Sequence, residues 1–284
     1  MTVDSARPDG GGDGSCVSSG LASATGEASM NNAAARDEDD GLGPDETPHV
    51  APRPISTRSA ISWWASGFAF LRRAPIRLSI VCLLPLLVEG LVQLIPLVGT
   101  PVSKIVVPLV GNGILVVFDR FWTTGHVEWR GLLWSFAAKN RARALQLALI
   151  SASVFVMQIL VATSVYGLAV FDAVVLGHGH AHPELAGRTF VLVLILPGLL
   201  PATLLLFAGP LVVLRGRRPV EAVISSIRLL LSSPGALAFT CCTMVAMITV
   251  SLLWGYSVFL LLVFFPWMGA TGYMAYRDVY IGRA

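Results

Sequence analysis

The sequence is poor in charge. Charged residues make up 13% of its 284 residues, whereas hydrophobic residues make up 55%, and the mean hydropathy is +0.72. Soluble domains carry roughly 25% charged residues. The composition therefore excludes an ordinary water-soluble domain and predicts a membrane protein.

The chain also lacks the short motifs that mark common enzymes. Neither of its two lysines lies in a phosphate-binding loop, and the sequence contains no His-Glu-x-x-His zinc motif and no Gly-x-Ser-x-Gly nucleophile elbow. No dinucleotide fingerprint follows a predicted strand, and no apolar segment repeats the polar stripe of a channel. We expect no enzyme activity and no cofactor.

Cysteine is scarce and is not arranged for metal or redox chemistry. Cys16 lies in the first part of the chain, and Cys82, Cys241 and Cys242 lie inside apolar segments, without any Cys-x-x-Cys spacing. We interpret them as small apolar residues.

Residues 1–52 differ in composition from the remainder. Residues 1–50 hold ten acidic residues against Arg7 and Arg36, and the segment has few residues able to build a core. Such a segment is predicted to be a disordered acidic tail. It is either an interaction tail or an unselected extension, for which Met30 is an alternative start. The first sixty residues hold no apolar signal-peptide core, so we expect the first span to direct targeting.

Residues 53–284 contain six apolar stretches that could cross a bilayer as helices. A helix needs about 20 apolar residues to cross the hydrocarbon core. The fifth and sixth stretches are separated by Trp254-Gly255-Tyr256, which favours a tight turn. We predict an all-α bundle of six transmembrane helices. Its spans lie near residues 78–98, 101–118, 145–170, 190–214, 236–254 and 257–276.

The short segments between these spans carry their positive charge on one side. Sixteen lysines and arginines fall before span one, between spans two and three, between spans four and five, and after span six. Only Lys104 and Arg188 fall on the opposite side. Because basic loops stay in the cytoplasm, both termini are predicted to be cytoplasmic. A nucleic-acid partner is not needed to explain this charge, which faces anionic lipid headgroups.

A weak repeat precedes spans one, three and five. Three hydrophobic residues, spaced by four and three positions, recur at a constant distance before Pro75, Asn140 and Pro234. This spacing puts each trio on one face of a short helix, so we predict three amphipathic helices in the membrane interface. The trios are Trp64, Phe68 and Leu71; Trp129, Leu133 and Phe136; Val223, Ile227 and Leu230.

Three segments of the sequence together resemble a known family of membrane proteins. The segments are SWWASGFAFLRRAP, which ends in Arg-Arg-x-Pro, the LIPLVG segment at residues 94–99, and LPGLLPATLLLFAGP in span four. Together they resemble uncharacterised multi-pass inner-membrane proteins of proteobacteria, loosely similar to the YciC-like membrane proteins. The resemblance covers about residues 60–280. It implies a bacterial inner-membrane location and no catalytic residues.

Glu89 is the one acidic residue deep within an apolar stretch. A charge there costs several kcal/mol unless it is paired, protonated or wetted. Gln93 lies one turn further along, and Asn112 lies at a similar depth in the returning span, so we expect Glu89 to face one of them between spans one and two. A structural hydrogen bond between helices, a proton or cation site, and lipid exposure are the three alternatives.

The loop before span four contains three alternating histidines, His178, His180 and His182, and follows Asp172. Either an extended or a helical backbone could bring some of these rings to one metal ion. The surrounding glycines oppose a preformed site, so we predict no specific metal binding. A sensing or delivery site is the alternative.

Proline and glycine crowd span four and predict a bent helix. Broken helices line transport sites in known carriers, but plain kinks are also common. We therefore keep two hypotheses. The first is a structural, lipid-interacting or partner-binding membrane protein; the second is a small-solute or ion transporter that uses Glu89 and the bent span.

Overall fold

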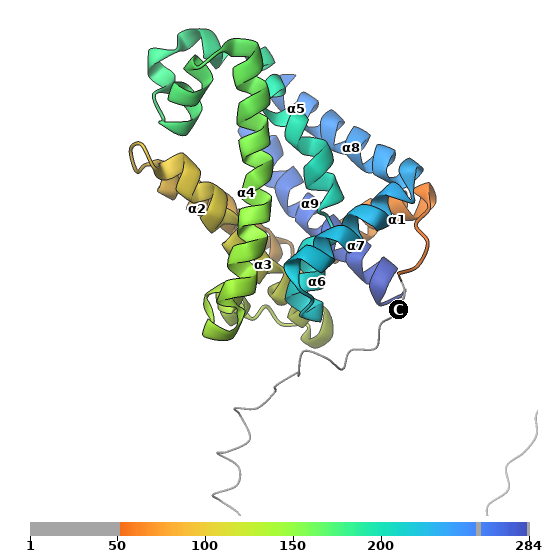
Figure 1. Cartoon of the computed structure of the whole chain (residues 1–284). Helices are drawn as coiled ribbons and strands as arrows, with labels where there is room; N and C mark the ends of the chain where they lie inside the picture. Colours follow the sequence, from red (N-terminus) through yellow and green to blue (C-terminus); the bar gives the residue numbers. More distant parts are fainter. Residues whose placement is uncertain (1–51, 254–256, 283–284) are drawn as a thin grey trace, which may run out of the picture. The chain divides into compact units, whose positions relative to one another are not determined.

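The computed structural model describes residues 52–253 and 257–282, and over these residues the chain forms helices and no strands (Figure 1). The predicted all-α class is confirmed. The predicted acidic tail lies outside the described residues except for Pro52. The turn predicted at residues 254–256 also lies outside them.

Four long helices are apolar enough to cross a membrane. They are α2 (Pro75–Gln93), α3 (Gly99–Thr124), α4 (Ala138–Tyr166) and α8 (Pro234–Leu253). A fifth candidate is the pair α5 (Arg188–Leu204) and α6 (Ala208–Arg215), which is bent by 45°. The predicted sixth span coincides with α9 (Ser257–Tyr280), which does not meet the same criterion over its described residues. The structure therefore shows four or five candidate spans, and six are not confirmed.

The ends of helices α2 and α4 differ from the predicted span boundaries. Helix α2 ends at Gln93 rather than near residue 98, because Pro96 cannot continue a helix and Leu97 adopts a positive φ of 65°. Helix α4 begins at Ala138, seven residues before the predicted start, so its first turns carry charged side chains. It ends at Tyr166, where Gly167 has a φ of 78°.

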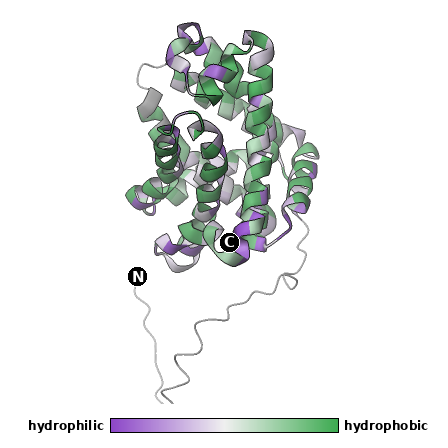
Figure 2. Cartoon of the chain, turned by 60° about the vertical axis from the view of Figure 1, so that its left-hand side comes forward, coloured by the Kyte–Doolittle hydropathy of each residue, from purple (hydrophilic) through white to green (hydrophobic). Residues whose placement is uncertain are grey.

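Hydrophobic residues dominate the long helices, and hydrophilic residues gather toward their ends (Figure 2). Many large apolar side chains on these helices are exposed, among them Leu87, Leu91, Leu160 and Val165. In water such a surface would be unfavourable. In a bilayer it is the surface that contacts lipid.

The three predicted amphipathic segments fold differently from one another. The first lies in α1 (Thr57–Leu71), the second is the 3₁₀ helix η1 (Trp129–Phe136), and the third lies in α7 (Pro219–Leu231). Trp64 and Leu71 are buried, the trio of η1 is exposed, and Leu230 is fully buried. The repeat does not share one pattern of burial, and its interfacial role stays a prediction.

Helix α1 packs closely on α9. A side chain at Gly67 would lie 2.6 Å from the Thr271 hydroxyl oxygen, so only glycine allows this approach. The Trp267 ring nitrogen donates to the Trp64 carbonyl oxygen at 2.8 Å, and the two rings meet edge to face. The start of the described chain is thereby joined to its last helix.

The predicted bend of span four is present, and a serine from another helix supports it. Pro197 and Pro201 lie inside α5, and the helix breaks before α6. The Ser226 hydroxyl of α7 donates to the Leu204 carbonyl oxygen at 2.6 Å and accepts from the Phe207 N–H at 3.1 Å. Backbone groups released at the break are therefore satisfied inside the protein.

Three short helical turns connect α4 to α5. They are η2 (Phe171–Val175), η3 (Gly179–Ala181) and η4 (Pro183–Ala186). Leu185 packs with Ile159 and Phe190 in a small apolar cluster at this end of α4 and α5. The cluster anchors the loop that contains His178, His180 and His182, which we call the histidine loop.

Candidate functional site

Glu89 lies near the end of α2 and forms an ion pair with Lys104 of α3. Its carboxylate also accepts a hydrogen bond from the Gln93 amide at 3.2 Å. The Lys104 ammonium group lies 5.2 Å from the ring centroid of Phe155 in α4, within cation–π range. Gln93 was predicted from the sequence as a partner of Glu89, whereas Lys104 was not. The arrangement links three helices and balances the charge of the acid.

Asn112 does not contact Glu89. It lies in the middle of α3, is 6% exposed, and its amide nitrogen has no hydrogen-bond partner. Gly113 beside it touches the backbone of Leu132, where η1 folds back onto α3. The three intramembrane polar candidates therefore occupy two separate places.

The histidine loop is organised by Asp172. The Asp172 carboxylate bonds to His178 Nδ1 and to His182 Nε2, each at 2.9 Å, and His182 Nδ1 lies 3.1 Å from Glu184 Oε1. The His180 ring centroid is 6.3 Å from that of His178 and joins neither bond. In the part of the chain that the structure describes, no three metal-ligating side chains converge on one point.

These contacts shift the ionisation of the loop. Hydrogen bonds from His178 and His182 lower the pKa of Asp172, and the hydrogen bond to Asp172, followed by that to Glu184, raises the pKa of His182. A backbone hydrogen bond, with a second contribution from His182, lowers the pKa of Glu184. The side chains of Asp172 and His182 are partly exposed to water, and that of Glu184 is exposed. The three groups therefore form an ion-paired surface cluster, which we call the histidine clasp, rather than a buried catalytic centre.

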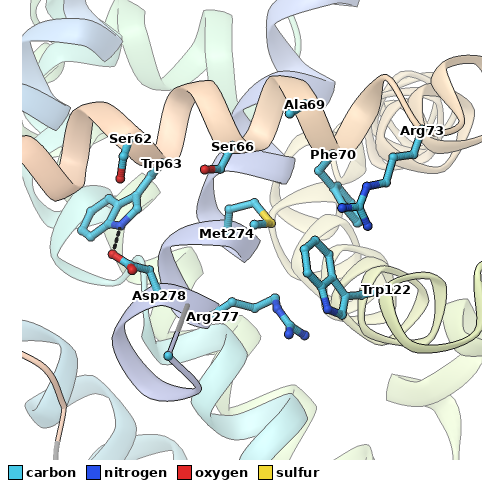
Figure 3. A pocket seen from close by; sticks show the side chains of 11 residues that line it. Ser62, Trp63, Ser66, Ala69, Phe70, Arg73, Trp122, Met274, Arg277 and Asp278 are labelled. Carbon is cyan, nitrogen blue, oxygen red and sulfur yellow. Dashed lines mark hydrogen bonds between the residues drawn. The ribbon is translucent and has the colours of Figure 1, made fainter. Parts of the chain in front are cut away.

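A different set of residues forms the strongest candidate site, a cavity between α1, the end of α3 and the end of α9 (Figure 3). We call it the arginine cavity. Its volume is about 430 Å³, within the range of small-molecule sites. Arg73, Trp122 and Arg277 lie on one side of it, and Ser62 and Trp63 lie across Met274 from them.

Trp122 orients both arginines. The guanidinium carbon of Arg73 lies 4.5 Å from the Trp122 ring centroid, and that of Arg277 lies 4.2 Å from it. Each contact is a cation–π interaction. Two positive groups are thereby held at one aromatic ring, an arrangement that favours an anion between or beside them.

Arg277 is held more firmly than Arg73. Its side chain is 11% exposed, and it donates to the Tyr273 hydroxyl at 3.2 Å. That hydroxyl donates to the Asp119 carboxylate at 2.9 Å, and Asp119 lies 3.9 Å from the Arg277 guanidinium. This network fixes Arg277 before any ligand arrives, whereas Arg73 is exposed and can adjust.

The cavity also contains one carboxylate, Asp278, which accepts a hydrogen bond from the Trp63 ring nitrogen at 2.9 Å. The cavity wall thus carries two guanidinium groups, one carboxylate and the hydroxyls of Ser62 and Ser66. The guanidinium and hydroxyl groups can bind an anionic oxygen group by charge and hydrogen bonds.

In the sequence, Arg73 and Arg277 indicated topology, and Arg73 also belonged to the Arg-Arg-x-Pro motif, but nothing joined the two arginines into a site. Residues 73, 122 and 277 are too far apart in the sequence for any motif to join them. The one local sequence feature that pointed to this site was Tyr273, one helical turn before Arg277 at the end of an apolar run.

Comparison of the chain with family models, curated proteins and solved structures found no match in any of the three. The resemblance to the YciC-like membrane proteins therefore stays a prediction.

Proposed function

We propose that this chain is a multi-pass membrane protein that binds the anionic headgroups of phospholipids through the arginine cavity. The observation that carries the proposal is the convergence of Arg73 and Arg277 on Trp122. Arginine pairs with phosphate oxygens through two parallel hydrogen bonds, and tryptophan prefers the membrane interface. The role is binding, not catalysis.

The proposed setting is a bacterial inner membrane crossed six times, with both termini in the cytoplasm. The distribution of sixteen basic residues against two supports this orientation. In it, the arginine cavity faces the cytoplasmic leaflet, whose surface is negative. The exposed apolar trio of η1 then lies against lipid beside α3.

The test is lipid selection by the purified full chain. The protein is reconstituted in nanodiscs of equal parts phosphatidylglycerol and phosphatidylcholine, and native mass spectrometry measures the lipid that it retains. We expect phosphatidylglycerol to be enriched, and Arg73→Gln to reduce the enrichment about fivefold, because each basic residue near the surface contributes about 1 kcal/mol. Arg277→Lys, which keeps the charge but loses the paired geometry, is expected to have an intermediate effect.

Arg141→Gln is the matched control, since Arg141 is exposed near the start of α4 and does not line the cavity. Equal losses in Arg141→Gln and Arg73→Gln would mean that the lipid senses only general charge. Absence of enrichment in the unchanged protein would refute the proposal.

The transporter hypothesis has less support. The Glu89–Lys104 ion pair and the Gln93 hydrogen bond give the acid structural partners. Glu89 also does not line the cavity that lies at the break between α5 and α6. Ion-coupled uptake into proteoliposomes that disappears in Glu89→Ala would support a transporter instead.

A further inference from the structure

A second cavity lies where α3, α4 and α9 meet the break between α5 and α6. We call it the asparagine cavity, after Asn112. Its volume is about 420 Å³. It is distinct from the arginine cavity, because the two use different residues of α9: Met268, Gly269, Gly272 and Tyr273 here, and Met274, Arg277 and Asp278 there.

Two polar side chains interrupt its apolar wall besides Tyr273, whose hydroxyl is bonded to Asp119. They are Asn112 of α3 and Ser151 of α4. The Asn112 amide nitrogen is buried without a hydrogen-bond partner. A buried polar group without a partner is costly, so a ligand with a matching group would stabilise this side chain. A half-turn of the planar amide exchanges its nitrogen and oxygen, so Asn112 can offer a ligand either a donor or an acceptor.

The walls favour a flat, neutral ligand. Four glycines line the cavity, at positions 111, 209, 269 and 272, so backbone surface replaces side chains at these four places. No lysine, arginine, aspartate or glutamate lines the cavity. A charged ligand would therefore be desolvated without compensation.

The depth of Asn112 decides between classes of lipid. Helix α3 has 26 residues and is about 39 Å long, with Asn112 close to its midpoint. If α3 crosses the bilayer with its midpoint at the centre, Asn112 lies about 15 Å from each edge of a hydrocarbon core that is about 30 Å thick. The ester groups of a phospholipid remain near those layers. A lipid quinone is dissolved in the bilayer interior and carries its carbonyl oxygens on a flat ring.

We propose that the asparagine cavity binds a neutral lipid of the quinone type, with a ring carbonyl accepting a hydrogen bond from the Asn112 amide. The Ser151 hydroxyl supplies a second hydrogen-bond donor toward the same ring. The ring lies against the glycine-lined wall, and the apolar tail leaves toward the surrounding lipid. The proposal concerns binding, and it does not depend on the headgroup site.

The test uses decylubiquinone as the probe and native mass spectrometry of the full chain in mild detergent as the readout. We expect a saturable one-to-one complex. Decylbenzene has the same tail and a ring without carbonyls, so we expect it to bind several-fold more weakly. Asn112→Leu is expected to weaken decylubiquinone binding about three- to tenfold without unfolding, since it removes a group that has no partner.

A steric pair of variants gives an independent test. A Cβ atom at Gly111 would meet no atom within 4 Å, so the backbone there leaves room for a larger side chain at the cavity wall, and we expect Gly111→Leu to abolish the complex. Gly90→Leu is the control, because Gly90 of α2 is equally open but does not line the cavity. Arg73→Gln is expected to leave quinone binding unchanged.

Three results would overturn the proposal: no saturable complex with decylubiquinone, equal binding of decylbenzene, or equal effects of Gly111→Leu and Gly90→Leu. Preferential binding of dioleoylglycerol over decylubiquinone would overturn the quinone assignment as well.

Discussion

At the residue scale, the role of a polar side chain in this protein depends on the residue that the fold places beside it. The histidines of the loop before α5 drew attention as metal ligands, yet Asp172 binds two of them and Glu184 contacts one. Glu89 drew attention as a proton site, yet Lys104 neutralises it. In both cases the partner is a charged residue that the sequence pattern alone did not assign to the group.

The histidine clasp predicts a pH dependence of loop order. The pKa of His182 is raised above its ordinary value of 6.5, so the contribution of His182 to the clasp is fully present below pH 6.5 and is lost as pH rises through the raised pKa. The pKa of Asp172 is lowered below its ordinary value of 3.8, so its contribution is lost only as pH falls through the lowered pKa. The loop is therefore most ordered between about pH 4 and 6.5.

The measurement is a titration of the His182 ring by ¹⁵N nuclear magnetic resonance. Asp172→Asn is expected to lower the His182 pKa more than Glu184→Gln does, because the Asp172 hydrogen bond is the larger cause. His180→Gln serves as the control, since His180 does not take part in the clasp. An unchanged His182 pKa in Asp172→Asn would show that the clasp does not form in solution.

At the element scale, the break between α5 and α6 depends on a residue of a third helix. Ser226 is fully buried and serves both backbone groups at the break. Ser226→Ala leaves the Phe207 N–H and the Leu204 carbonyl without this partner, so we expect a loss of about 1–3 kcal/mol in the free energy of unfolding. Thermal or denaturant unfolding in detergent measures it.

Ser153→Ala is the control for this change. The Ser153 hydroxyl bonds to the Ile150 carbonyl within its own helix and is exposed, so its loss should cost little. If Ser226→Ala is as stable as Ser153→Ala, the break is supported by the prolines alone.

The contrast between Ser226 and the prolines shows what the sequence could predict. Pro197, Pro201 and Pro210 predicted a bend because proline acts on its own helix. Nothing local marked Ser226, since its role depends on contact with a helix break some twenty residues earlier. Positions of the long helices followed from apolar length alone, but the ends of α2 and α4 depended on Leu97 and Gly167, whose backbone angles are set by the turns.

The candidate sites show the same contrast between signals that are local in the sequence and contacts between distant segments. Asn112 could be selected because a polar residue within an apolar run is conspicuous in the sequence. Its cavity could not, because five helices build the walls. The arginine cavity was missed for the same reason, since its cations and its tryptophan come from three distant segments.

At the scale of the whole molecule, the contacts between chain ends constrain the number of membrane crossings. Arg73 precedes α2, Trp122 lies near the end of α3, and Arg277 lies near the end of α9, yet all three meet in one cavity. If α2, α3 and α9 cross a bilayer, the start of α2, the end of α3 and the end of α9 are therefore on the same side of it. An even number of crossings must separate Trp122 from Arg277.

Between Trp122 and Arg277 the chain has α4, the bent pair α5–α6, α8 and α9, which make four crossings if each spans the bilayer. Leaving out α9 would make three and would place Arg277 on the side opposite Trp122, in conflict with the 4.2 Å contact between them. This argues for α9 as the sixth span.

The prediction is that reporters fused after Ala284 and inserted within residues 1–50 both report the cytoplasm, while a reporter inserted at Gly179 reports the outside. A control reporter placed after Arg217, in the basic segment that follows α6, is expected to report the cytoplasm. An external signal from the fusion after Ala284 would exclude six spans, and it would also separate the arginine cavity from the cytoplasmic leaflet to which we assign it.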